Sequence, residues 1–164
     1  LLEAVLPDTL IIAPPGAGKT TLLRCIAGLE TAEGSRVEDV PGPVAMVFQE
    51  DRLLPWRTAL ENVALVRDGS SGDATRLLDA MELSAEAEKL PAALSGGMQR
   101  RVALARALNF GGDVLLLDEP FKGLDEALRA RVIAAGRGRF PLTVIATHDR
   151  AEAEALGMTG EILL

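Results

Sequence analysis

The chain has 164 residues, of which 48% are apolar and 3% aromatic, with no Tyr. This length suffices for one domain with an aliphatic core. The formal net charge is −7 and no Lys/Arg block exceeds a pair, so nucleic acid is not an expected partner. No apolar run approaches the roughly 18 residues of a membrane span, and the first residues lack a signal-peptide layout. The single Cys25 suits a reducing cytosol.

Predicted strands and helices alternate along the chain. Strand-like runs occupy 9–13, 44–48, 113–118 and 142–147, and helical patterns occupy 19–28, 58–67, 73–82, 97–109 and 125–137. The alternation predicts an α/β fold with a mostly parallel sheet. No strand signal occurs between 50 and 109. We therefore expect one domain over 1–164, with an α/β core at 1–49 and 110–164 and an inserted helical subdomain at 50–109.

A glycine-rich turn joins the first predicted strand to the first predicted helix, in the sequence APPGAGKTT (13–21). Such a turn directs several backbone N–H groups and a helix N-terminus at one point, which favours a phosphate group. Lys19 can reach the outer phosphates, and the Thr20 hydroxyl can ligate Mg²⁺. The phosphate-loop pattern has glycine at Ala13, where alanine costs little at negative φ and about 1–2 kcal/mol at positive φ. An ordinary strand–turn–helix corner is the alternative.

Polar side chains also follow three later predicted strands. Asp118 and Glu119 lie in VLLLDEPF (114–121), His148 follows LTVIAT, and Gln49 follows VAMVF. Open α/β sheets bind ligands at the carboxyl ends of their strands. We expect Asp118 to hold the Mg²⁺ shell, Glu119 to orient or deprotonate water, and His148 to contact the γ-phosphate or that water. Solvated acids and a surface histidine are the alternatives.

A second bare helix start occurs in LSGGMQRRVALARAL (94–108). Ser95, Gly96 and Gly97 precede a helical pattern, and a small, uncovered helix N-terminus is itself an anion site. Two such helix starts in one chain could complete each other's site across a two-fold dimer. A plain Ser N-cap followed by glycines is the alternative.

These segments, in this order, resemble the nucleotide-binding subunit of an ABC transporter. APPGAGKTT resembles the Walker A loop, VFQED the Q-loop, LSGGMQ the signature motif, VLLLDEP Walker B, KGLD (122–125) the D-loop and ATHD (146–149) the switch histidine. The ordered set covers nearly the whole chain and is highly specific. The resemblance implies a P-loop NTPase fold with a RecA-like core, and Mg²⁺-dependent hydrolysis of ATP.

The family's residue roles carry over by position. The resemblance implies that ATP phosphates are bound by Gly16, Ala17, Gly18, Lys19, Thr20 and Thr21. It implies a Mg²⁺ site formed by Thr20, Gln49 and Asp118. It makes Glu119 the general base, with His148 and Gln49 as further catalytic residues. ATP held by the opposite subunit would meet Ser95, Gly96 and Gly97, with Asp125 at the dimer seam.

The segment QEDRLLPWRTALENV (49–63) narrows the resemblance. It is similar to subunits that energise importers of the nitrate, sulfonate and taurine type, and DEPFKGLD resembles short bacterial members of that group. The resemblance implies a head-to-tail homodimer with composite ATP sites, a transmembrane permease that docks near Gln49–Trp56, and a solute-binding protein. It places the chain in the cytoplasm, peripherally on the inner face of the cell membrane. A core anchor is the alternative role for Trp56.

The start of the chain departs from the family pattern. Such subunits usually begin with an antiparallel β region that carries an adenine-stacking aromatic. Here 18 residues precede Lys19 and none is aromatic, so we expect this region to be truncated and adenine to be held weakly. A nucleotide-binding module with weak or no hydrolysis is therefore a second hypothesis. A soluble ABC ATPase of DNA repair or translation is a third hypothesis. The single cassette and the negative net charge of the chain disfavour it.

Overall fold

The structure is a computed structural model that describes residues 9–12, 14, 16–31, 37, 40–67, 71–148 and 160–163. The chain divides into two compact units. We call the first the sheet unit; it comprises 1–49, 112–120 and 140–164. We call the second the helical unit; it comprises 50–111 and 121–139.

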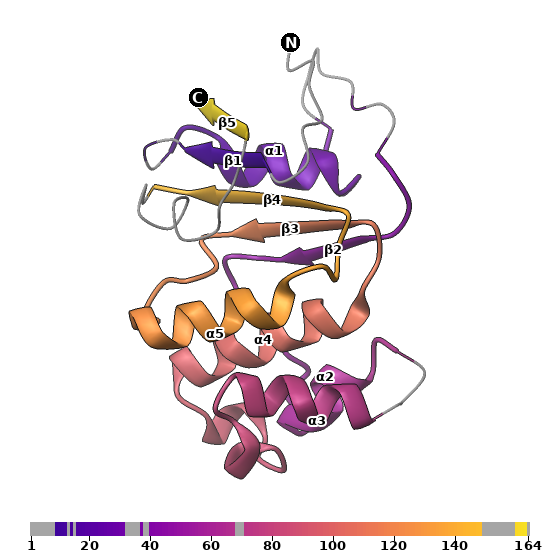
Figure 1. Ribbon diagram of the computed structural model, residues 1–164, viewed down its shortest axis with the longest axis vertical. Coiled ribbons are helices and arrows are strands. Elements are labelled where there is room, and N and C mark those ends of the chain that lie inside the picture. The colour runs from indigo at the N-terminus through magenta and orange to yellow at the C-terminus, as the bar shows by residue number, and fades with distance from the viewer. Residues whose placement is uncertain are drawn as a thin grey trace. The chain divides into compact units, whose positions relative to one another are not determined.

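The sheet unit is built on five parallel strands. They are β1 (Thr9–Ile12), β2 (Val44–Val47), β3 (Val114–Asp118), β4 (Leu142–Thr147) and β5 (Gly160–Leu163). Their order is β2-β3-β4-β1-β5 (Figure 1), and all four described pairings are parallel. Every residue of β3 is buried, which explains why its sequence is a continuous apolar run instead of an alternating one.

One helix of the sheet unit, α1 (Lys19–Ile26), packs on the sheet. Its Leu23 is fully buried. The core cluster around it comprises Ile11, Val114, Leu116, Leu142, Val144 and Ala146. Within β3 and β4 these residues are spaced by two, so they share one face of the sheet. This packing fixes the start of α1 next to the carboxyl ends of β1, β3 and β4.

The helical unit contains α2 (Ala59–Ala64), α3 (Ser71–Ala80), α4 (Gly96–Phe110) and α5 (Glu126–Gly136), with short 3₁₀ turns at Ser84–Glu86 and Pro91–Ala93. Helix α3 packs against α2, as Figure 1 shows, and also against α4 and α5. Helix α2 also packs against α4. Three of these helices begin at a side-chain N-cap, the capping residues being Thr58, Ser95 and Asp125. Each cap satisfies an otherwise unpaired N–H group of the first turn.

The predicted α/β class with a parallel sheet is confirmed, and the four predicted strands are present within a residue of their predicted ends. Ala13 lies outside the described residues. The strand β5 was not predicted. The sequence predicts that 121–139 belongs to the α/β core. The structure groups this segment with the helical unit, because α5 packs against α3. The description of 1–164 as one domain stays a prediction.

Across the described part of the chain, no helix is both long and apolar enough to cross a lipid bilayer.

Candidate functional site

The candidate site lies at the carboxyl edge of the parallel sheet. Strand β4 pairs with both β1 and β3, with Ile12 opposite Thr147 and Asp118 opposite Ala146. The Glu119 N–H continues this pairing by donating to the Ala146 carbonyl at 2.9 Å. Three neighbouring strands therefore end side by side, at the place where parallel sheets usually bind ligands.

In the loop between β1 and α1, the described residues Gly16 and Gly18 carry no side chain. Gly18 is the N-cap of α1 and makes no side-chain cap hydrogen bond, and the first turn contains no acidic residue. A Cβ atom added at Gly16 or Gly18 would meet nothing within 4 Å, so both glycines border open space. The Ala17 N–H donates to the Pro14 carbonyl at 3.3 Å and closes the turn. Such a helix start attracts an anion.

Lys19 adds a positive charge directly beside this loop. The side chain is buried, with 7% of the residue exposed, and its Nζ donates to the Pro14 carbonyl at 3.1 Å. The same Nζ lies 3.9 Å from Oε1 of Glu119. The ammonium group is thus held between the loop backbone and the carboxylate at the end of β3.

Thr20 and Asp118 are joined although they lie far apart in the sequence. The Thr20 Oγ1 donates to Oδ2 of Asp118 at 2.6 Å, and Asp118 is almost fully buried. A hydroxyl and a carboxylate are oxygen ligands of the kind that Mg²⁺ takes. Their contact brings together two of the three residues predicted to hold the metal, and the donor set fits a hard cation.

Glu119 also contacts the only histidine. The His148 Nδ1 lies 3.0 Å and 2.9 Å from the two carboxylate oxygens of Glu119. The His148 side chain is 60% exposed, whereas that of Glu119 is 19% exposed. The structure therefore assembles Lys19, Glu119 and His148 into one contiguous chain of charged and polar groups beside the loop.

The backbone of Glu119 has φ of 47°, in the left-handed region that a side chain with a Cβ atom disfavours. Strain of this kind persists where the surrounding structure imposes it and is concentrated at functional sites. Here the hydrogen bond from the Glu119 N–H to Ala146 fixes the residue at the strand end.

We expect Glu119→Gly to be more stable than Glu119→Ala by about 0.5–1 kcal/mol. Both variants lose the contacts with Lys19 and His148, but only glycine accepts a φ of 47° without the ~1–2 kcal/mol penalty of a Cβ atom. Part of this gain is offset because glycine has more freedom in the unfolded chain. Urea denaturation of both variants measures the difference. Equal stability would show that Glu119 is not strained.

The other predicted site residues are not joined to this cluster by any described contact. Gln49 follows β2 at the same edge and is exposed, as is Thr21. Ser95, Gly96, Gly97 and Asp125 belong to the helical unit. Ser95 Oγ accepts from the Met98 N–H at 3.3 Å, and Asp125 Oδ1 accepts from the Leu128 N–H at 2.8 Å. Both residues thus serve as N-caps, and their roles toward a nucleotide stay predictions.

Sequence reasoning missed a polar cluster in the helical unit that fixes the segment after Gln49. Arg106, on α4, donates to the carbonyls of Asp51 and Arg52, both at 2.9 Å, and burial lowers its pKa while nearby Asp51 opposes the shift. Asn62, on α2, is fully buried and binds the turn 54–58.

Trp56 in that turn is 70% exposed, so its alternative role as a core anchor is wrong.

The parallel sheet, the bare loop before α1 and the acids at the end of β3 define a P-loop NTPase-like protein. A family model described as "ABC transporter" matches residues 8–122. The chain belongs to the ABC transporter family.

The curated relatives include ATP-binding proteins named for aliphatic sulfonate import. SsuB 2 of Agrobacterium fabrum is 43% identical over 159 residues, with 90% of this chain and 61% of that protein covered. SsuB 1 of Rhodococcus jostii is 44% identical over 162 residues, with 93% and 65% covered. The chain spans about three fifths of the length of these relatives.

Solved structures show the same fold. The ATP-binding cassette MJ0796, in a dimeric post-hydrolysis state bound to ADP and Pi, matches with a TM-score of 0.79 and 28% identity over 96% of this chain and 81% of that one. A second dimeric structure of MJ0796, described as a bacterial ABC transporter cassette, matches with a TM-score of 0.78.

Proposed function

We propose that the chain binds and hydrolyses ATP as the energising subunit of an ABC importer and drives a solute through a partner membrane permease. The observation that carries this proposal is the contact of Glu119 with both Lys19 and His148 beside an open phosphate loop. A nucleotide-binding module that does not hydrolyse ATP would not need the Glu119 carboxylate beside the phosphate loop. The names of the relatives make aliphatic sulfonates the proposed solute class.

The residues of the sheet unit suggest how this reaction is divided. Lys19 and the loop N–H groups would neutralise the phosphates, and Thr20 and Asp118 would hold Mg²⁺, with Gln49 as a third ligand. Bound Mg²⁺ supplies charge stabilisation to the phosphates in such reactions. Glu119 would accept the proton of the attacking water through Oε1 or Oε2. His148, whose Nδ1 touches both oxygens, would keep the carboxylate oriented.

The assembly we propose is a homodimer with two composite sites. In it Ser95, Gly96 and Gly97 of one subunit would face the ATP on the phosphate loop of the other, and Asp125 would lie at the seam. The dimeric state of the matched cassette structures supports this arrangement. The permease would dock near Gln49–Trp56, where the exposed Trp56 offers a large apolar surface, and a solute-binding protein would deliver the cargo. The chain would act on the inner face of the cell membrane.

We expect Lys19→Ala to weaken MgATP binding by roughly 10–100-fold, because a charge-assisted contact to phosphate contributes about 1.5–3 kcal/mol. Isothermal titration of the folded chain with MgATP measures this change. The control is Lys89→Ala, which removes a half-exposed lysine that pairs with Glu86 in the helical unit. Equal affinity in wild type and Lys19→Ala would contradict the phosphate site. Tight binding by the wild type without phosphate release would favour the non-hydrolysing module.

A further inference from the structure

We propose that Asn62 is a positioning residue that holds the exposed turn 54–58 in a single conformation and so presents Trp56 to the permease. The inference rests on the proposed function, because it takes Trp56 as part of the permease-docking surface. It adds a residue that does not itself reach that surface, since Asn62 is fully buried.

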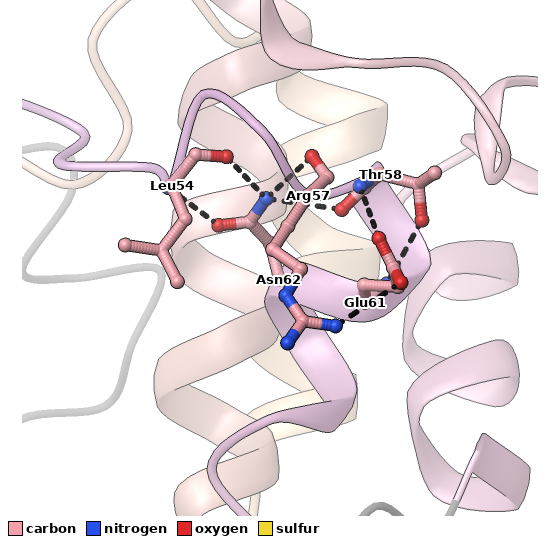
Figure 2. Close-up of polar contacts among 5 residues, drawn as sticks. All are labelled: Leu54, Arg57, Thr58, Glu61 and Asn62. Atoms are coloured by element: carbon pink, nitrogen blue, oxygen red, sulfur yellow. Dashed lines mark hydrogen bonds and ion pairs between the residues drawn. The ribbon is translucent and has the colours of Figure 1, made fainter.

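The Asn62 amide uses its hydrogen-bonding capacity on the turn, as Figure 2 shows. Its Oδ1 accepts from the Leu54 N–H at 2.8 Å. Its Nδ2 lies 3.1 Å from the Leu54 carbonyl and 3.0 Å from each of the carbonyls of Arg57 and Thr58. Two N–H hydrogens thus serve three carbonyl oxygens, so at least one hydrogen is shared. One buried side chain binds the backbone on both sides of Trp56.

The turn depends on this side chain because it belongs to no helix or strand. Its internal backbone hydrogen bond is the one from the Arg57 N–H to the Leu54 carbonyl, at 3.1 Å. At its far end, Thr58 and Glu61 form a reciprocal capping box that joins the turn to α2 (Figure 2). The hydrogen bond from the Thr58 N–H lowers the pKa of Glu61, which keeps the capping carboxylate ionised. Asn62 therefore replaces the backbone pairing that regular secondary structure would provide.

A fixed position of Trp56 would increase the affinity of the chain for its partner. Trp56 is 70% exposed, the largest exposed fraction among the exposed large hydrophobic residues of the described part of the chain, and tryptophan is enriched among the residues that dominate interface energetics. Ordering a loop on binding reduces affinity, and a turn ordered beforehand avoids that loss. The partner that fits is a permease segment with apolar side chains that can cover the indole ring.

The chain provides a matched control for the role of Asn62. Asn109, on α4 of the same helical unit, is equally buried. Its Nδ2 donates to the Val63 carbonyl at 2.8 Å and not to the turn. Asn62→Ala and Asn109→Ala therefore both remove a buried amide, but only the first removes the bonds that hold the turn.

The decisive measurement is the time-resolved fluorescence anisotropy of Trp56, which is the only Trp in a chain without Tyr. We expect Asn62→Ala to increase the amplitude of fast indole motion at least twofold, and Asn109→Ala to leave it as in the wild type. Unchanged motion in a folded Asn62→Ala variant would overturn the positioning role. So would an equal increase in both variants, because it would indicate general loosening of the helical unit.

Hydrogen exchange keeps the proposal testable if Asn62→Ala does not fold. In the wild-type chain, the Leu54 N–H should exchange at least 100-fold more slowly than an unprotected amide, as slowly as the amides of α2. Exchange at the unprotected rate would overturn the proposal, because it would show that the Oδ1 bond does not persist in solution.

The permease half of the inference has its own test. The probe is the permease that co-purifies with the chain, once identified by mass spectrometry and reconstituted in lipid nanodiscs. We expect Trp56→Ala and Asn62→Ala each to weaken its binding at least tenfold, and Asn109→Ala to change it less than twofold. Unchanged binding by Trp56→Ala would overturn the docking part of the proposed function. Unchanged binding by Asn62→Ala alone would overturn only the role of Asn62.

Discussion

Glu119→Gln is expected to lower ATP turnover by roughly 10²–10⁴-fold, the usual contribution of a general base, while MgATP binding is retained. The substitution preserves size and the left-handed backbone, but a neutral amide cannot accept the proton of the attacking water. The carboxylate lies within 3.9 Å of the Lys19 ammonium and 2.9 Å of the His148 ring, so it stands beside the phosphate loop and not in bulk solvent. Phosphate release under saturating MgATP measures turnover, and isothermal titration measures binding.

The helical unit provides the control for this substitution. Glu82 also has a left-handed backbone, with φ of 56°, and it pairs with Arg131 at 2.6 Å on an exposed surface. Glu82→Gln should leave turnover within twofold of the wild type, because its carboxylate pairs with Arg131 of the same helical unit. Full hydrolysis by Glu119→Gln would remove Glu119 as the base, and a loss in both variants would point to a defect of folding.

Gly112→Ala is expected to destabilise the sheet unit by about 2–5 kcal/mol. Gly112 has φ of 109°, and a Cβ atom there would lie 2.6 Å from the Pro43 carbonyl oxygen. That oxygen accepts hydrogen bonds from the N–H groups of Asp113 and Val114, where β2 and β3 begin to pair. Backbone strain of about 1–2 kcal/mol therefore adds to an overpacking cost of about 1–3 kcal/mol. Chemical denaturation followed by far-UV circular dichroism measures the loss.

Gly28→Ala separates the two costs. Gly28 also belongs to the sheet unit and has φ of 69°, but a Cβ atom there would meet nothing within 4 Å. We expect it to cost only the ~1–2 kcal/mol of the left-handed backbone. If Gly112→Ala were no worse than Gly28→Ala, the close approach between Gly112 and Pro43 would be contradicted.

The sheet unit could be predicted from the sequence because its signals are local and repeated. Continuous apolar runs indicated β3 and β4 as buried strands, and the polar residues that follow them could be placed at one edge by the geometry of parallel sheets. The contacts of Thr20 with Asp118 and of Glu119 with His148 follow from that placement. The ABC transporter family was recognised from the order of the motifs and is confirmed by the family model.

The features that could not be predicted depend on contacts distant in sequence. Strand β5 is short, and it completes the sheet by pairing with β1, about 150 residues earlier in the chain. The grouping of α5 with the helical unit depends on its packing against α3. In the sequence, Asn62 cannot be told apart from an ordinary helix residue. Its four hydrogen bonds go to the turn 54–58, which has no sequence motif that would indicate them. Such side chains are identified by burial, which the sequence does not contain.

The ammonium group of Lys19, which we propose to bind phosphate, already has an internal counter-ion in Glu119. A triphosphate that reaches the loop must compete with the Glu119 carboxylate for this ammonium group, since both anions would draw on the same Nζ. Displacement of the carboxylate would leave Glu119 with His148 as its neighbour. With Lys19 as the proposed phosphate ligand and Glu119 as the proposed base, substrate arrival would free the carboxylate from its ion pair with Lys19 in a single ion-exchange step.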